Sequence, residues 1–320
     1  MNDFKIYKVI LLIFLLNILA CSQKEKASNI EIVRFEKEFH HSSEESLLDL
    51  IKKYPFLFPN EYPISIWNNL LKDSSKIKIF NETLKVFQNF DPIAKEIELI
   101  FINAKNIFPN FTPPKVFTLN SESEYLNRVI YADSLLFISL DSYLGESYYK
   151  GIPSYISQTM SEKFITNDVA FKISEHYVKD AINELDSLDR TFLSKMIFHG
   201  KVLFINKLLL PENEDYLLFH SSKDKIDWAN DNENNIWANF VENEYLYDTN
   251  DELKTRFILI SPYSKFNLDI DKNSPGSIGK WLGYRIVSSF MKNNIVSIEQ
   301  LMKENYQNIF NKSNYKPKKK

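Results

Sequence analysis

Residues 274–285 read Ser274-Pro275-Gly276-Ser277-Ile278-Gly279-Lys280-Trp281-Leu282-Gly283-Tyr284-Arg285, and this segment holds three of the chain's six glycines within eight residues. The glycines are spaced three and four residues apart, so on a helix they form one strip without side chains. Such a strip lets another backbone approach closely. The segment therefore predicts a helix, running to about Met291, that packs against a neighbour inside the domain or in a partner.

Three other residues of this segment are of the types enriched at interaction hot spots, Trp281, Tyr284 and Arg285. We expect Gly279 and Gly283 to face the interior of the domain, and Trp281 and Arg285 to face a partner. The candidate binding residues are Gly276, Gly279, Trp281, Gly283 and Arg285.

Helical periodicity dominates the chain on both sides of a short middle region. Apolar residues recur at three- and four-residue spacing in 77–90, 93–104, 169–182 and 192–205. Residues 115–119, 128–132 and 135–140 read as strands, the last two joined by a tight turn at Asp133-Ser134. We predict a single mostly helical α+β domain over residues 30–311 with a small antiparallel sheet, followed by a basic tail over 312–320.

Composition excludes several classes of protein. Of the 320 residues, 44% are hydrophobic and 14% aromatic, which is enough for a large core and excludes general disorder. A net charge of -3 provides no electrostatic footprint for nucleic acid, so no nucleic-acid partner is expected. One Cys excludes a disulfide scaffold and a Cys-rich metal site. Neither a G-x-S-x-G elbow nor a Walker loop occurs.

The first 20 residues have the pattern of a secretory signal peptide. Lys5 and Lys8 precede the apolar run Val9–Leu16, which is too short for a permanent membrane span. The sequence Ile18-Leu19-Ala20-Cys21 is similar to a bacterial lipobox, in which the cysteine is acylated and becomes the first residue. An ordinary signal peptide or a signal anchor is the alternative.

Acyl chains on Cys21 would hold the protein on a lipid bilayer. Residues 21–29 are then the lipidated cysteine and a short polar tether. Because Ser22 and not Asp follows the cysteine, the common inner-membrane retention signal is absent. We expect a location in the cell envelope, facing the periplasm, at the outer rather than the inner membrane.

The pair Glu175-His176 is half of a zinc-protease motif, which needs His at i and i+4 and Glu at i+1 on one helix. Lys172 and Ile173 occupy the other two places. A protonated lysine does not ligate zinc and isoleucine cannot transfer a proton. We therefore expect His176 and His199 to be core histidines, with no metal and no cofactor.

Motifs spread along the chain resemble those of the gliding motility lipoprotein GldB family of the Bacteroidetes. The motifs are the lipobox, Ile32–Phe35, Tyr54-Pro55, Ser139–Gly145, Gly151–Pro153, Lys201–Phe204 and Pro275–Gly283. The resemblance implies an envelope component of bacterial gliding that binds other proteins of the gliding machinery and has no enzymatic activity.

A fainter similarity links the chain to predicted zinc proteases. It places Lys172, Ile173 and His176 in the H-E-x-x-H helix and His199-Gly200 at the Glu-Gly pair of the next helix. This similarity implies a degenerate, inactive zincin-like domain with vestigial metal-site positions. The alternatives are a divergent metallohydrolase that uses His176 and His199, and a glycan-binding module that uses exposed aromatic residues.

Overall fold

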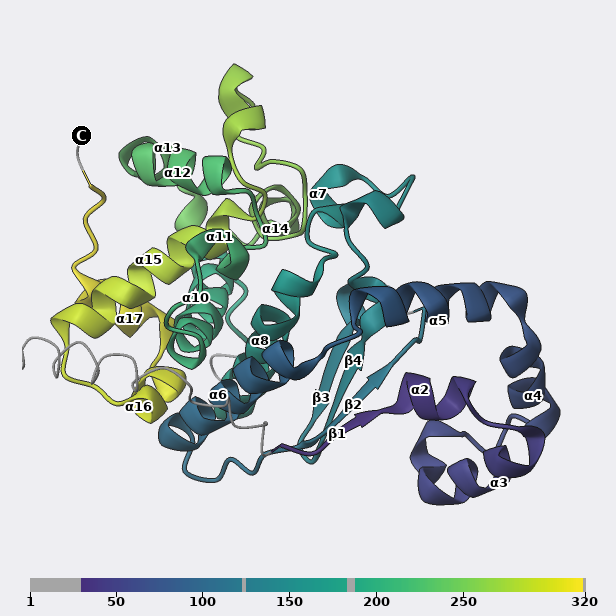
Figure 1. Cartoon of the computed structure of the whole chain (residues 1–320). Helices are drawn as coiled ribbons and strands as arrows, with labels where there is room; N and C mark the ends of the chain where they lie inside the picture. The colour runs from purple at the N-terminus through teal and green to yellow at the C-terminus, as the bar shows by residue number, and fades with distance from the viewer. Residues whose placement is uncertain (1–29, 123–124, 183–187, 319–320) are drawn as a thin grey trace, which may run out of the picture.

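The structure is a computed structural model that describes residues 30–122, 125–182 and 188–318. The signal peptide, Cys21 and the tether lie outside the described residues. Within these ranges a helix-rich α+β domain surrounds one sheet (Figure 1). This confirms the predicted fold class.

The sheet contains four strands, β1 (Ile32–Arg34), β2 (Lys115–Leu119), β3 (Val129–Ala132) and β4 (Leu135–Ser139), in the order β1-β2-β4-β3. Only β3 and β4 pair antiparallel, across the predicted Asp133-Ser134 turn. β2 pairs parallel with both β1 and β4, so the expectation of an antiparallel sheet is corrected to a mixed one. The reason is connectivity, because parallel neighbours need long connections and antiparallel neighbours accept a two-residue turn.

Helices make up most of the remaining chain, joined in several places by short 3₁₀ turns such as Tyr125–Asn127 and Asp269–Asn273. The helices are α2 (Phe35–His40), α3 (Glu44–Lys53), α4 (Ile64–Lys72), α5 (Ser74–Val86), α6 (Asp91–Ile107), α7 (Ser154–Ser157), α8 (Ile165–Ala181), α10 (Phe192–Leu209), α11 (Asp215–Leu218), α12 (Lys223–Asp231), α13 (Glu233–Glu242), α14 (Asp251–Phe257), α15 (Ile278–Asn293), α16 (Ile298–Lys303) and α17 (Tyr306–Ser313).

Asparagines stand at two of the boundaries between consecutive helices. Asn232 separates α12 from α13, and its side-chain amide donates to the carbonyl of Trp228 at 2.9 Å. Asn305 separates α16 from α17, and its side chain accepts from two backbone N–H groups of α17. A short amide side chain that bonds nearby backbone groups competes with helix continuation. α17 also extends to Ser313, into the predicted basic tail.

The two faces of the sheet bury different cores, as the two-residue period of a strand requires. Val116, Leu136 and Ile138 face the core formed with α6 and α8. Phe117 and Phe137 face a smaller core with α2 and α3. In Figure 1, α6 and α8 pass along one side of the sheet, while α2 to α5 form a separate group at its other side.

α10 lies at the centre of the helical part and is buried on nearly all sides. Its first half, including Phe192 and Met196, belongs to the core shared with α15 and α17. Its second half, including Val202 and Leu209, belongs to the core against the sheet. Apolar residues on most sides of the helix, as α10 has them, are expected in such a position.

The glycine strip of α15 packs inside the domain. A Cβ atom built on Gly283 would lie 1.9 Å from the carbonyl oxygen of Met196 in α10, and one on Gly200 would lie 2.3 Å from the carbonyl oxygen of Gly283. A Cβ on Gly279 would lie 2.9 Å from the carbonyl oxygen of Phe257. No side chain fits these distances, so the backbones of α10 and α15 are in direct contact.

The expectation that Trp281 and Arg285 face a partner needs correction for the tryptophan. Trp281 is 2% exposed and belongs to the core that also contains Phe192 and Phe257. Arg285 is partly exposed and donates to both carboxylate oxygens of the buried Glu233, at 3.0 and 2.9 Å.

We predict that Gly283→Ala lowers the free energy of unfolding by about 2–3 kcal/mol, because the added methyl group must separate two helices. On an exposed helical site the same substitution would stabilise by about 0.5–1 kcal/mol. Chemical denaturation monitored by circular dichroism measures the change. Lys292→Ala, at an exposed position of the same helix, is the control and should be near neutral. A stable Gly283→Ala variant would contradict the direct backbone contact.

Candidate functional site

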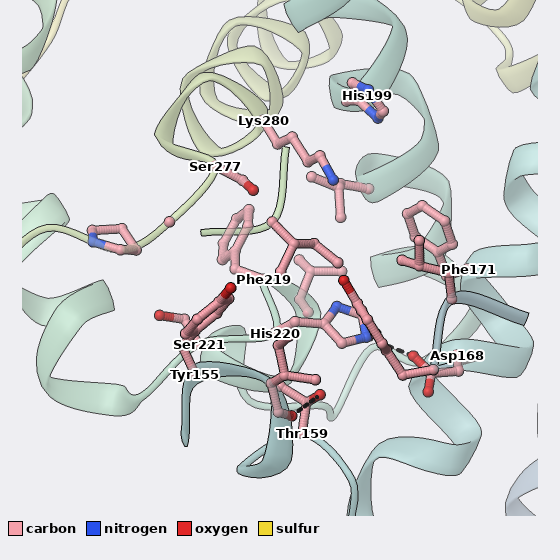
Figure 2. Close-up of a pocket in the computed structure, with 18 of the residues that line it drawn as sticks. Tyr155, Thr159, Asp168, Phe171, His199, Phe219, His220, Ser221, Ser277 and Lys280 are labelled. Carbon is pink, nitrogen blue, oxygen red and sulfur yellow. Dashed lines mark hydrogen bonds and ion pairs between the residues drawn. The ribbon is translucent and has the colours of Figure 1, made fainter. Parts of the chain in front are cut away.

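A hollow of about 450 Å³ lies between α8, α10 and α15 (Figure 2). Residues within 125–129, 155–159, 218–226, 260–262 and 275–277, from short helices, the start of β3 and loops, complete its wall. The volume is typical of sites for small molecules. The hollow is therefore the candidate functional site.

Cationic side chains outnumber anionic ones around the hollow. The cations are Arg128, Lys172, Lys179, Lys225 and Lys280, and the anions are Asp168 and Glu175. Apolar side chains, including Phe171, Leu203 and Trp281, form much of the remaining wall. The arrangement suits a ligand with an anionic group and an apolar part.

One end of the hollow is a satisfied polar cluster around Asp168. Its carboxylate accepts hydrogen bonds from Arg128 Nε at 2.7 Å and from the Tyr143 hydroxyl at 2.6 Å, and lies 2.5 Å from His220 Nε2. Burial opposes ionisation of Asp168, but the charges of Arg128 and His220 outweigh burial and lower its pKa to about 2. This carboxylate is fully engaged by its neighbours.

The other end contains two polar groups that have no hydrogen-bond partner among the described residues. The ammonium group of Lys280 makes no hydrogen bond or ion pair with any residue that the structure describes. The side chain borders the hollow, yet protein surrounds its ammonium group, and this burial lowers its pKa to about 8. The nearby carboxylate of Glu175 is already paired with Lys179 at 3.1 Å.

His199 lies beside Lys280 in Figure 2. Its Nδ1 is buried and has no hydrogen-bond partner among the described residues. Burial, and then the charge of Lys280, lowers its pKa well below the usual range, so the imidazole is neutral at pH 7. Buried polar atoms are nearly always paired in folded proteins, so these two groups distinguish this end of the hollow from the Asp168 end.

The structure does not bring the four vestigial metal-site positions together. Lys172 and His199 line the hollow, whereas Ile173 is buried in the core against the sheet. His176 points to the β3–β4 turn, with Nε2 3.0 Å from Asp133 and 3.3 Å from Asp180.

The stripe of α8 that faces the hollow contains Asp168, Phe171, Lys172, Glu175 and Lys179. His176 lies about 100° of helix rotation from Glu175 and about 40° beyond Lys172, at the edge of this stripe. Among the described residues no three His, Cys, Asp or Glu side chains are grouped so as to hold a metal ion.

Of the five candidate binding residues, Gly276 and Trp281 line the hollow. Gly283 contacts α10, Gly279 contacts Phe257 and neighbouring side chains, and Arg285 pairs with Glu233. Sequence reasoning missed Lys280 although it lies between buried Gly279 and Trp281 in the segment that it emphasised. The sequence signal that could have identified Lys280 is a lysine flanked by apolar residues within a predicted helix.

We predict that Lys280→Met stabilises the domain at neutral pH by about 1–3 kcal/mol, since it removes a buried unpaired charge. The folded-state pKa lies near 8 and the unperturbed value is 10.5. Between these values the unfolded state binds the proton more tightly, so wild-type stability rises with pH and the advantage of the variant shrinks.

Thermal and urea unfolding at neutral pH and at about pH 10 measure both effects. Lys292→Met, an exposed position of the same helix, is the matched control and should show neither effect. A Lys280→Met variant less stable than wild type at neutral pH would show that the ammonium group has a partner.

The comparisons with known proteins agree with the resemblance read from the sequence motifs. The chain matches the family described as Gliding motility protein GldB over residues 20–317. Neither curated proteins nor solved structures gave a significant match. No helix among the described residues is long and apolar enough to cross a membrane. The match covers nearly the whole chain, and the chain therefore belongs to the gliding motility protein GldB family.

Proposed function

We propose that this protein is a lipid-anchored component of the bacterial cell envelope that serves gliding motility as a non-catalytic binding subunit. Family membership supports the role in gliding. The observation that carries the binding role is the hollow, which combines surplus cations with the unpartnered Lys280 and His199. Groups that lack partners in the free protein are suited to recognition.

The same hollow favours binding over hydrolysis. A catalytic zinc site needs three protein ligands and an open position. The α8 stripe presents Lys172 and Glu175 there, and the only other carboxylate of the wall, Asp168, is fully engaged by Arg128, Tyr143 and His220. A divergent metallohydrolase would need ligands that this wall does not offer.

The proposed lipid anchor lies in the N-terminal part of the sequence. Cys21 follows a short apolar run and lies within the family match. Acylation at this cysteine attaches the domain to a lipid bilayer, with the outer membrane and a periplasm-facing domain as the favoured location. Other envelope proteins of the gliding machinery are its proposed partners.

We predict that Cys21→Ser moves the protein from the membrane fraction to the soluble periplasm, or leaves the precursor unprocessed, and that cells lose spreading on agar. The reason is that the thiol is the acceptor of the lipid. Fractionation with immunoblotting and colony spreading measure the outcomes. Ser22→Ala is the control for a change beside the site and should retain anchoring and spreading. Normal processing and membrane retention of Cys21→Ser would refute the anchor.

We also predict that the protein purifies without stoichiometric zinc and that added zinc does not raise its melting temperature. Elemental analysis and thermal melting measure this. The His176→Gln and His199→Gln variants separate the alternatives, because His176 faces the β3–β4 turn and His199 faces the hollow. One tightly bound zinc per chain, lost in both variants, would establish the metallohydrolase reading instead.

A further inference from the structure

We propose that the hollow binds an amphiphilic carboxylate, with its carboxylate group at Lys280 and His199 and its apolar body extending to the mouth of the hollow. This inference rests on the proposed binding function and names the class of ligand. It follows from the groups left unpaired, the groups already paired, and the apolar path between them.

The anion-binding end is formed by Lys280 and His199. The ammonium group of Lys280 has three N–H donors, and none of them reaches an acceptor among the described residues. The buried Nδ1 of His199 also lacks a partner there. In the tautomer that carries its proton on Nδ1, the neutral imidazole adds one more donor. A single carboxylate accepts from both side chains and satisfies both.

The other cations of the wall already have partners. Arg128 is paired with Asp168 at 2.7 Å, and Lys179 with Glu175 at 3.1 Å. Lys225 donates to the backbone carbonyls of Pro262 and Ser274.

Lys172 lies at the edge of ion-pair distance, with its ammonium 3.9 Å from Glu175. Among the described residues, the anion-binding end therefore offers one unpaired positive charge and a neutral histidine. This matches a singly charged carboxylate better than a phosphate group, which usually attracts several cations or an arginine fork.

The rest of the ligand must be apolar. Phe171, Leu203 and Trp281 line the hollow beside its anion-binding end. Leu126 and Ile260 also line it, but they are 52% and 44% exposed. Because an apolar body that follows this wall would cover both exposed side chains, the mouth is complementary to an aliphatic or aromatic tail.

The test uses the mature lipidated protein in nanodiscs, with protein-free nanodiscs as background. Carboxyl-labelled dodecanoate is titrated and followed by the NMR shift of its carboxyl carbon. Dodecanol lacks the charge, monododecyl phosphate changes it, and acetate lacks the apolar body. We expect saturable binding of one dodecanoate per chain. We expect affinities for the three comparison compounds to be at least about tenfold weaker.

Lys280→Met should weaken dodecanoate binding by about tenfold to a hundredfold and leave dodecanol binding unchanged. Lys280→Arg should retain part of the affinity, because it keeps the charge. Lys292→Met, on the same helix, should bind as wild type. Thermal melting of Lys280→Met, which we predict to be more stable than wild type, separates lost binding from unfolding.

Two sources of the ligand are distinguished by a second pair of probes. A fatty acid from membrane lipid predicts tight binding of dodecanoate and hexadecanoate, whereas a compact organic acid predicts tighter binding of phenylpropanoate. Absence of saturable carboxylate binding, equal binding by Lys280→Met, preferred binding of the phosphate, or binding of an apolar peptide C-terminus in place of free acids would each overturn the proposal. The Leu203→Trp variant, which fills part of the hollow, distinguishes failure of the ligand class from failure of the binding function. If this variant folds but does not support spreading, and the protein contains no zinc, the binding function stands and only the ligand class is wrong.

Discussion

Direct backbone contact between α10 and α15 is the constraint on which the helical part of the structure depends. The carbonyl group of Gly283 occupies the space in which a side chain at position 200 would lie, and the carbonyl of Met196 does the same for position 283. α10 is buried on nearly all sides, so its position against α15 also determines how it packs against α8 and the core next to the sheet. A larger residue at Gly200 or Gly283 must therefore displace residues of both cores that α10 joins.

The same contact fixes the chemistry of the hollow. His199 directly precedes Gly200, and Lys280 directly follows Gly279, so close approach of the two helices sets the ammonium group near the imidazole. Neither group has a hydrogen-bond partner in the part of the chain that the structure describes, and this costs stability. Proteins tolerate such costs chiefly at functional sites, where local consistency gives way to binding.

Much of the fold could be predicted from sequence, and the hollow could not. Helical periodicity located α8 and α10, and the Asp133-Ser134 turn located the hairpin, because these signals are local. The parallel pairing of β1 with β2 joins distant segments and leaves no local signal. The zinc-motif comparison emphasised His176, but the hollow faces Glu175, since a shift of one residue rotates a helix by about 100°.

The two ends of the hollow differ in how the protein compensates a buried charge. Asp168 has its pKa lowered to about 2 by Arg128 and His220, so it contributes stability that is present above about pH 4 and is lost only in acid. Lys280 has its pKa lowered to about 8 by burial, so its charge costs stability at every pH below that value. At neutral pH the Asp168 end is therefore part of the scaffold. At the Lys280 end, the described residues leave the charge without a hydrogen bond or an ion pair, and the proposed anion would supply that partner.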